Sequence, residues 1–446
     1  MKIDKNAIDK ILASAIKKGA DQAEVFAMTS RSISVEAKDR QVDALERSED
    51  AGFSLRIIIG KRPGFSYSTD TDIWEDVVDK AIISAKWGVE DEFHGLPENN
   101  LYPIVEIEDK AIVDSTEETA IKMAIELEES ALDADNRIKK VRKASVSLSN
   151  YEKFIANSNG FYGTYRSTSS SISVTAMAQH NDESQVGWDF ETSKRLSDCS
   201  VQRVGKKASQ RAIDLLGAKK IESVKAPVIL ENSVANEFLG VLTSSLSSEN
   251  VQKGKSQLSG RIGQEIVSKK ISIIDDPLLP FHPASRPFDS EGVSSQKNIL
   301  ISDGILREFL YNTYTAKKDG RKSTGNAVRS GIYGLPGVGS SNLYLKSSTD
   351  DFIYPLHRIF AMIPKGLYIT EAMGLHTANP VTGEFSIGVN GLWIESGEVR
   401  FPVRDAVITG SILDIFKRVT AIGDDMRFYG GIGCPSLLID EMDISS

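Results

Sequence analysis

The strongest local signal for chemistry is a basic loop at residues 311–329, "YNTYTAKKDGRKSTGNAVR". It carries five cationic side chains and one anionic side chain, in a chain whose formal net charge is −9. Its second half combines short side chains with Gly325, which lets another backbone approach closely. Asn326 can pair with a peptide amide, and Arg329 can bind a carboxylate through two parallel hydrogen bonds. These features predict a loop that binds a peptide backbone or a carboxylate, and a solvated basic loop is the plainer alternative.

The histidines give no local signal for a metal site. The chain contains His94, His180, His282, His357 and His376. No two of them have the spacing of His-x-x-x-His or His-Glu-x-x-His, so solvated or hydrogen-bonded structural histidines are favoured. The sequence also lacks a Gly-x-Ser-x-Gly nucleophile motif and the spacing of a phosphate-binding P-loop.

Carboxylates gather at Asp275-Asp276 and at Asp289 and Glu291, where oxygen ligands for Ca²⁺ or Mg²⁺ are conceivable. No regular calcium-loop spacing is present, so we expect the aspartates to accept backbone N–H bonds in turns beside proline and glycine. Cys434 has no cation or helix N-terminus near it in sequence, which predicts a small buried apolar residue rather than a nucleophile.

The composition is that of an ordinary soluble protein, with 40% hydrophobic and 26% charged residues. No run approaches the roughly 18 apolar residues that a membrane helix needs. Cys199 and Cys434 are far apart, which is typical of a reducing cytoplasm, and the acidic balance argues against a general nucleic-acid binder. We therefore expect a cytoplasmic protein with no membrane and no direct nucleic-acid contact.

The segments that must position these residues fall into two halves. Hydrophobic periodicity predicts helices over 4–18, 74–88, about 115–135 and 200–216, the third with capping-box spacing between Ser115 and Glu118. Strands are predicted at 23–30, 32–39, 52–60, 64–70, 141–149 and 153–179, with a hairpin turn at Asn159-Gly160.

Beyond residue 225 the pattern changes to one helix near 233–250 followed mostly by short strands, glycines and turns. We place a boundary near 218–224. The prediction is an α+β protein with an N-terminal domain over 1–220, in which helices flank an antiparallel sheet. A β-rich C-terminal domain with few helices would follow over 221–446.

Four separated motifs resemble the TldD/PmbA family, and more closely its PmbA branch, also called TldE. They are "FDSEGV" (288–293), the loop at 311–329, "TANPVTGEFSIGVNGLWIESGE" (377–398) and "GIGCPSLLIDEM" (431–442). The resemblance implies a cytoplasmic two-subunit metalloprotease that trims unfolded peptides, and family members are also described as modulators of DNA gyrase. In that family, TldD-type subunits carry His-Glu-x-x-x-His on a helix and a cysteine near the C-terminus, which hold zinc.

The sequence departs from this pattern at the metal helix, which should lie at 232–254. The positions of the His-Glu-x-x-x-His motif fall on Leu239, Gly240 and Ser244, and the cysteine position falls near Ala421. Leucine, glycine and alanine cannot coordinate zinc, and a lone serine is a poor ligand. By resemblance, we expect no catalytic residue, metal or cofactor in this chain.

The resemblance and the departure together imply a PmbA-like subunit that binds peptide and partner rather than cleaving. A TldD-like subunit would supply the zinc, and the chain alone would form a twofold homodimer. The peptide would be an unfolded one, bound by residues that face a cavity shared by the subunits. The predicted peptide-binding residues are Thr324, Gly325, Asn326, Arg329 and His376.

Two alternatives stay open at this point. The chain could be a stand-alone homodimer that binds peptides or gyrase-type partners without hydrolysis. It could instead be a hydrolase whose metal ligands come from distant positions, with His282, His376, Asp275 and Glu291 as candidates.

Overall fold

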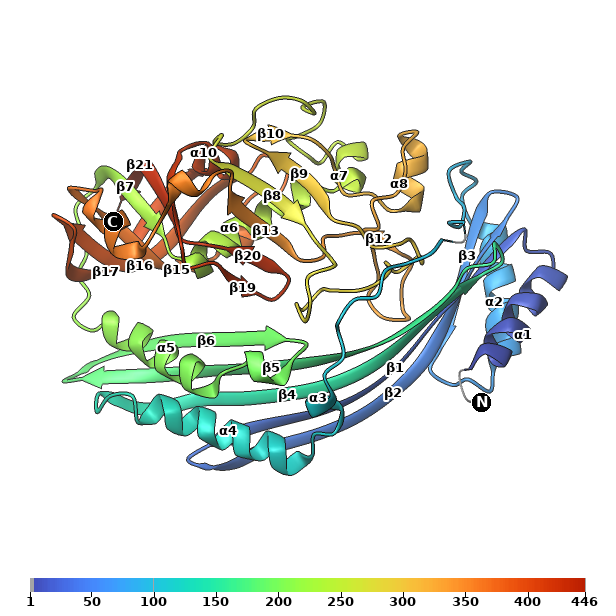
Figure 1. Ribbon diagram of the computed structural model, residues 1–446, viewed down its shortest axis with the longest axis horizontal. Coiled ribbons are helices and arrows are strands. Elements are labelled where there is room, and N and C mark those ends of the chain that lie inside the picture. Colours follow the sequence, from blue (N-terminus) through green and yellow to red (C-terminus); the bar gives the residue numbers. More distant parts are fainter. Residues whose placement is uncertain (1–3, 99, 446) are drawn as a thin grey trace.

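A six-stranded antiparallel sheet dominates the first half of the chain in the computed structural model, which describes residues 4–98 and 100–445. The strand order is β3-β2-β1-β4-β5-β6. Figure 1 shows this sheet as a long curved ribbon beside the C-terminal half. The strands are β1 (Gln22–Lys38), β2 (Gln41–Ile59), β3 (Arg62–Ser68), β4 (Ile138–Asn157), β5 (Tyr162–His180) and β6 (Glu183–Ser193).

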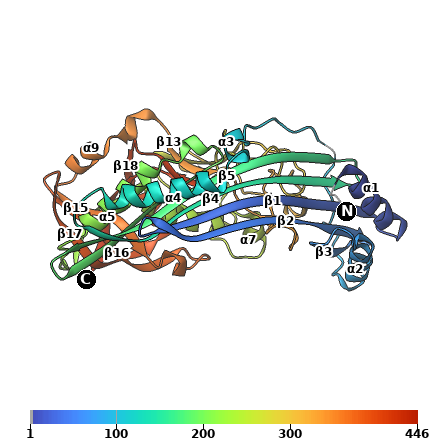
Figure 2. The same cartoon turned by 90° about the horizontal axis from the view of Figure 1, so that it is seen from below.

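Two pairs of helices cover one face of this sheet, one pair at each end (Figures 1 and 2). Side chains alternate between the faces of a strand. Accordingly, Val25 of β1 packs under α1 and α2, and Val35 packs under α4 and α5 on the same face. We call this the outer face. The helices are α1 (Lys5–Lys17), α2 (Trp74–Trp87), α3 (Lys110–Val113), α4 (Glu117–Leu132) and α5 (Val201–Asp214), with a 3₁₀ turn η1 (Leu196–Asp198).

The opposite, inner face of the sheet meets the C-terminal half at one end. Phe26 of β1 and Ile155 of β4 pack there with Phe161, Phe288 and Ile332. The aromatic rings of Phe161 and Phe288 meet edge to face, with centroids 5.4 Å apart. An apolar cluster therefore joins the N-terminal sheet to the loops of the second half.

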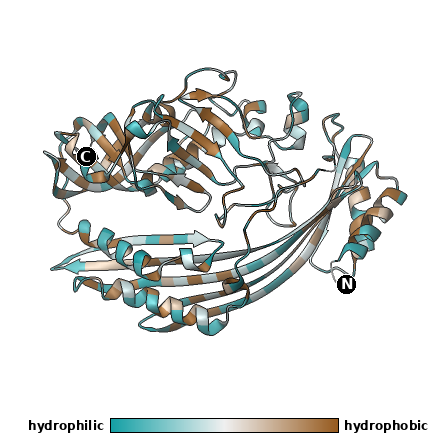
Figure 3. Cartoon of the chain, in the orientation of Figure 1, coloured by the Kyte–Doolittle hydropathy of each residue, from teal (hydrophilic) through white to brown (hydrophobic). Residues whose placement is uncertain are grey.

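The second half contains a seven-stranded sheet, a six-stranded sheet and a short two-stranded sheet. The seven-stranded sheet has the order β14-β18-β21-β17-β16-β15-β7, and the six-stranded sheet has the order β10-β9-β8-β13-β20-β19. Figure 3 shows hydrophobic residues throughout these strands. The strands are β7 (Val224–Leu230), β8 (Ile271–Asp275), β9 (Asn298–Ser302), β10 (Ile305–Leu306), β11 (Ala327–Val328), β12 (Gly337–Val338), β13 (Leu343–Ser347), β14 (Ile353–Tyr354), β15 (Lys365–Met373), β16 (Glu384–Glu395), β17 (Glu398–Ser411), β18 (Val419–Gly423), β19 (Arg427–Tyr429), β20 (Ile432–Cys434) and β21 (Leu437–Ser445).

The helices of the second half are short. The longest, α6, supplies Phe238 and Leu242 to the largest apolar cluster of the molecule. Lys219, in the segment before β7, already pairs with Val403 of β17. The helices are α6 (Asn232–Ser245), α7 (Ser248–Gln252), α8 (Thr313–Lys318), α9 (Leu356–Ala361) and α10 (Ile412–Lys417), with 3₁₀ turns η2 (Asp350–Phe352) and η3 (Leu375–Thr377).

The α+β class with an antiparallel N-terminal sheet is confirmed, and several element boundaries differ from the prediction. β1 is one strand rather than two, and β2 begins at Gln41 instead of residue 52, because its first part is exposed and lacks apolar alternation. Thr116, not Ser115, caps α4 by accepting a hydrogen bond from Thr119 N. The helix expected near 233–250 is broken into α6 and α7.

No helix among the described residues combines the length and the apolar character that a membrane crossing needs.

Candidate functional site

The segment 311–329 contains a short helix, α8, where the sequence suggested a loop. Asn312 caps this helix by accepting from Thr315 N at 2.9 Å, and the Thr315 hydroxyl accepts from Asn312 N at 3.2 Å. This reciprocal pattern is a capping box. The helix also packs on α7, where Gln252 donates to Thr315 O at 2.8 Å and Ser248 Oγ lies 2.8 Å from Thr315 Oγ1.

Thr324 and Asn326 are buried within this segment and bind other parts of the same chain. Thr324 Oγ1 accepts from Tyr311 N at 2.7 Å and lies 2.7 Å from Asn326 Oδ1. Asn326 Nδ2 donates to Asp275 Oδ2 at 2.7 Å and to Gly339 O at 3.1 Å. Peptide binding by these two side chains stays a prediction, and it would require these internal hydrogen bonds to break.

The other three predicted peptide-binding residues have different settings. Gly325 has φ +75°, and a Cβ there would lie 2.8 Å from Ser294 O, so the packing of the loop itself requires glycine. Arg329 has a side chain only 1% exposed, and it pairs with Glu24 of β1. His376 lies exposed in η3. Peptide binding by these three residues stays a prediction.

Arg329 belongs to a buried ion network that joins the two halves of the chain. Arg56 of β2 donates to Glu24 at 2.7 Å and to Glu291 at 2.8 Å, and Thr313 N donates to Glu291 at 2.8 Å. Burial opposes the charge of Arg56, but Glu24 and Glu291 outweigh it and raise the pKa of the guanidinium. Burial also disfavours the Glu291 carboxylate, but Arg56 lowers its pKa below the usual value. We call these four side chains of Glu24, Arg56, Glu291 and Arg329 the paired network.

A cavity of about 230 Å³ lies next to the paired network, between the two halves. His94 and Tyr314 line it with stacked rings whose centroids are 5.0 Å apart, and Tyr314 OH donates to Asp91 at 2.7 Å. Burial is the main cause that lowers the pKa of His94, so its imidazole is neutral at pH 7. The cavity is smaller than the pockets that take drug-sized ligands, about 300–1,000 Å³.

The clustered aspartates accept backbone N–H groups, which confirms the role in turns expected for them. Asp289 accepts from Glu291 N, Val293 N and Ala327 N, each at 2.9 Å. Burial and the neighbouring Glu291 raise the pKa of Asp289 to about 7. Asp276 accepts from Leu278 N at 3.0 Å.

Helix α6 presents no zinc ligand at the positions that correspond to the metal motif. Leu239 is fully buried in the largest apolar cluster, and Ser244 Oγ donates to Val241 O at 2.9 Å within the helix. Ala421 is 1% exposed in a second apolar cluster. Zinc takes nitrogen, sulfur and carboxylate ligands, so these residues do not fit the ion.

The structure also does not assemble the alternative metal site. Within 4–98 and 100–445, no three His, Cys, Asp or Glu side chains are placed to hold a metal ion together. His282 packs edge to face on Phe428, and Glu291 is engaged by Arg56. The hydrolase alternative built on His282, His376, Asp275 and Glu291 is therefore wrong in its choice of ligands.

Cys434 is fully buried, as the sequence predicted, and burial raises the pKa of its thiol well above the usual value.

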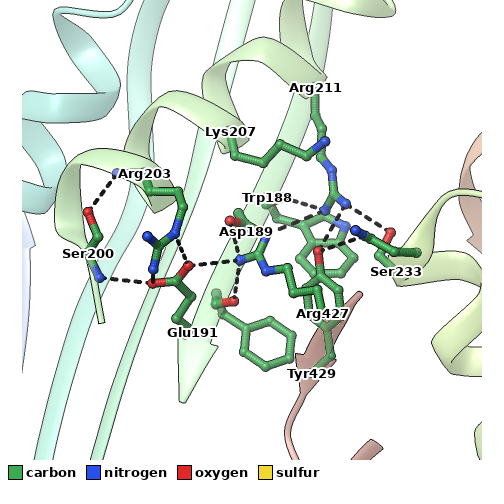
Figure 4. A network of polar contacts seen from close by, with 12 residues as sticks. Trp188, Asp189, Glu191, Ser200, Arg203, Lys207, Arg211, Ser233, Arg427 and Tyr429 are labelled. Carbon is green, nitrogen blue, oxygen red and sulfur yellow. Dashed lines mark hydrogen bonds and ion pairs between the residues drawn. The ribbon is translucent and has the colours of Figure 1, made fainter. Parts of the chain in front are cut away.

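A second polar network joins the halves at the β6 edge of the sheet (Figure 4). Arg427 of β19 donates to Asp189 at 2.7 Å and to Phe190 O at 3.0 Å. Arg211 of α5 donates to Glu231 at 2.6 Å and to Trp188 O at 2.9 Å. With the paired network at the other end, the C-terminal half is held to the N-terminal sheet at two separate places.

Comparison with known proteins identifies the family. Three models match in chain order: PmbA/TldA metallopeptidase domain 1 at 23–85, the central domain at 110–216 and the C-terminal domain at 223–446. This chain belongs to the PmbA/TldA metallopeptidase family. A relative named Metalloprotease PmbA from Escherichia coli O157:H7 is 30% identical over 451 residues, which cover 100% of this chain and 96% of the relative.

Two solved structures share the fold of this family member over nearly its whole length. A protein from Thermotoga maritima MSB8, named as a candidate modulator of a DNA gyrase, has TM-score 0.90 and 26% identity and covers 99% of this chain and 100% of its own. TldE from Thermococcus kodakarensis has TM-score 0.90 and 22% identity with the same coverage, which supports the fold. The name of the Escherichia coli relative also supports placing the chain in the PmbA branch.

Proposed function

We propose that this chain is the metal-free, PmbA/TldE-type subunit of a cytoplasmic two-subunit metalloprotease that degrades or trims unfolded peptides. The observation that carries the proposal is the side-chain chemistry of α6. Leu239 and Gly240 offer no donor atom, and the Ser244 hydroxyl binds its own helix. A TldD-like partner would supply zinc and its bound water, and this chain would bind peptide and partner.

The packing of α6 supports a retained structural role for this helix. Its buried residues include Val234, Phe238 and Leu242, which lie in the largest apolar cluster. An added Cβ at Gly240 would lie 3.3 Å from Ile432 Cδ1, so even a small side chain would be tight there. This packing supports a structural role for the helix in the core of the C-terminal half, and in our proposal another subunit supplies the chemistry.

The test is a peptidase assay on an unfolded, fluorescently labelled substrate such as β-casein. It compares this chain alone, a TldD-type subunit alone and the two mixed at equal concentration. We expect no cleavage by this chain alone, and faster cleavage by the mixture than by the TldD-type subunit. Cleavage by this chain alone that EDTA abolishes would overturn the proposal, as would a mixture no faster than the partner by itself.

A second candidate function is a stand-alone homodimer that binds peptides or gyrase-type partners without hydrolysis. It is favoured by the name of the Thermotoga maritima structure. Sedimentation of this chain with and without a TldD-type subunit separates the two candidates. A homodimer that persists in the mixture supports the second candidate, and exchange into a heterodimer supports the first.

A further inference from the structure

Three cations on the inner face of the N-terminal sheet have no carboxylate partner. Lys153 lies on β4, Lys194 follows β6, and Arg286 comes from the C-terminal half. Among the described residues, none of the three forms an ion pair. Lys194 Nζ donates to Tyr151 OH at 2.7 Å and to Ser167 Oγ at 2.6 Å. We call Lys153, Lys194 and Arg286 the unpaired cations.

Tyrosine rings lie beside two of the unpaired cations, Lys153 and Lys194. Lys153 Nζ lies 5.1 Å from the ring centroid of Tyr151 and 5.9 Å from that of Tyr165. Lys194 Nζ also lies 5.1 Å from the Tyr151 centroid. Aromatic faces attract cations but do not neutralise them, so these contacts do not replace an ion pair.

The pKa shifts of these groups agree with an excess of positive charge at this site. Burial lowers the pKa of both Lys153 and Lys194, and Arg286 lowers both further. Burial would raise the pKa of Tyr151, but Lys194 and Lys153 outweigh it and bring that pKa to about 8. Arg286 counteracts the raised pKa of two nearby buried carboxyls, Asp275 and Asp289, but forms an ion pair with neither of them.

Burying cations without a paired counter-ion costs free energy. Such a cluster in a stable fold therefore indicates that the functioning protein binds an anionic ligand there. Lys194 is only 1% exposed, and its ammonium group donates to Tyr151 OH and Ser167 Oγ rather than to solvent. Tyr151, Lys153 and Arg286 are half-buried. These three side chains can therefore reach a ligand that lies on the inner face.

A surface of small hydroxyl side chains adjoins the unpaired cations on the same face. In register across β1, β4 and β5, Ser32 pairs with Ser149 and Ser149 with Ser169, and the next row is built in the same way. All members are half-buried, and they lie opposite the face that α4 and α5 cover. The members of this serine surface are Ser32, Ser34, Ser145, Ser147, Ser149, Ser169, Ser171 and Ser173.

The serine surface fits an extended peptide of any sequence. Hydroxyls both donate and accept hydrogen bonds, and small uncharged side chains let a backbone approach closely. Moving along β4 from Ser149, the next inner-face residues are Tyr151 and then Lys153. A chain that lies over the serines therefore reaches the cations at one end.

We propose that Lys153, Arg286 and the Tyr151 hydroxyl bind the C-terminal carboxylate of an unfolded peptide whose preceding residues lie over the serine surface. Lys194 is a positioning residue that holds the Tyr151 hydroxyl from beneath. This inference rests on the proposed function, because it names the part of the substrate that this subunit would hold. Charge-assisted hydrogen bonds from two cations and a hydroxyl are what a terminal carboxylate accepts.

A nucleophilic role for the same residues is ruled out by their burial. Ser167 and Lys194 are within hydrogen-bond distance, as in a serine–lysine pair. Ser167 is fully buried, however, and its hydroxyl donates to Ile107 O at 3.0 Å. A substrate carbonyl cannot reach it, so this cluster binds rather than cleaves.

The test measures binding to this chain alone by fluorescence anisotropy. The probes are a labelled, unstructured Gly-Ala-Ser peptide with a free C-terminal carboxylate and the same peptide as a C-terminal amide. We expect the amide to bind at least about tenfold more weakly, because it loses the charge-assisted bonds. We expect Lys153→Gln and Arg286→Gln each to weaken binding of the acid and to erase its advantage over the amide.

Matched controls are Lys140→Gln and Arg142→Gln, which remove exposed cations from the same strand. Both controls should bind the acid peptide as the unchanged chain does. Lys153→Arg keeps the charge and should retain most of the binding, so loss with Lys153→Gln alone cannot be assigned to misfolding. Inorganic phosphate and acetate serve as competitors that identify a site for any small anion.

Equal binding of the acid and amide peptides would overturn the proposal, as would displacement of the acid peptide by phosphate at concentrations near the peptide's own dissociation constant. A failure of this proposal can be distinguished from a failure of the proposed function. If acid-selective binding is found but a TldD-type subunit is not stimulated, the carboxylate site stands and the subunit role fails. If stimulation is found without acid selectivity, the carboxylate site fails and the subunit role stands.

Discussion

The paired network and the unpaired cations both contain buried or half-buried cations, and they differ in the groups that surround those cations. Arg56 and Arg329 lie between the carboxylates of Glu24 and Glu291. Lys153 and Lys194 lie among hydroxyls and aromatic rings instead. Both clusters stand between the N-terminal sheet and the C-terminal half, so location alone does not explain the difference.

This comparison separates charges that stabilise the fold from charges that are available to bind a ligand. In the paired network each charged side chain lies beside an opposite charge, and removing one member leaves its partners buried without that charge. A buried cation without an ion-pair partner lowers the stability of the fold. Substitutions in the first cluster should therefore reduce stability, and substitutions in the second should reduce binding while leaving stability unchanged or higher.

The largest expected effect is that of Arg56→Met in the paired network. Glu24 and Glu291 would stay buried without their cation, and we expect the free energy of unfolding to fall by about 3–5 kcal/mol. Denaturant unfolding followed by tryptophan fluorescence measures the change. The matched control is Arg62→Met, whose side chain is 47% exposed and pairs at the surface with Glu90. Equal stability of the two variants would contradict the structural role of the network.

A smaller loss is expected for Arg427→Met in the second polar network. Its side chain is 20% exposed, and it would give up the hydrogen bonds to Asp189 and Phe190 O. We expect a loss of about 1.5–3 kcal/mol, the range for hydrogen bonds to a charged group. The same unfolding measurement should rank this variant between Arg56→Met and Arg62→Met. A loss of unfolding free energy as large as that of Arg56→Met would show that partial exposure does not reduce the destabilisation.

Lys153→Gln should leave stability unchanged or slightly raised, because it removes a buried charge that has no carboxylate partner. It should also raise the pKa of Tyr151 from about 8 toward its ordinary value of 10, since Lys153 is one of the two lysines that lower it. Tyrosinate absorbance during a pH titration measures the shift, and Tyr151→Phe identifies the titrating group. A marked loss of stability would place Lys153 among the structural charges.

The smallest expected effect comes from an unpaired carboxylate, Glu237 on α6. Partial burial of its carboxyl and the nearby Glu371 of β15 raise the pKa of Glu237 from 4.5 to about 7, and solvent screening of this exposed residue keeps the effect on stability small. A group with a raised folded-state pKa stabilises the fold below its unfolded pKa, and this stability is lost as the pH rises through 7. Glu237→Gln removes the loss, so the variant should gain stability relative to the unchanged chain between pH 5 and pH 8. Thermal melting at both pH values tests the sign, and parallel pH profiles would contradict it.

Local patterns predicted the class of the fold and many of its elements. The Asn159-Gly160 turn correctly placed the hairpin between β4 and β5, although the prediction interrupted β4 between residues 149 and 153. The first part of β2, from Gln41, was missed because its exposed residues show no alternation. Helix α8 was missed because it is short and its capping box begins at Asn312 inside a basic segment.

The candidate site was predicted in part, for a physical reason. The sequence showed that Arg329 can bind a carboxylate, but not that Glu24, 305 residues away, supplies one within the chain. The unpaired cations were missed because only the folded structure shows that no carboxylate among the described residues forms an ion pair with them. The serine repeat on β1, β4 and β5 was the one signal available in sequence, since serines at every second position imply one polar, uncharged face.

The most direct test of the central claim is the zinc stoichiometry of the purified chain by itself, measured by equilibrium dialysis followed by metal analysis. The chemistry of Leu239, Gly240 and Ser244 predicts much less than one tightly bound zinc per chain, with no change in thermal stability when zinc is added. One zinc per chain, bound with a rise in thermal stability and with EDTA-sensitive cleavage of an unfolded peptide, would contradict the metal-free role proposed for this subunit.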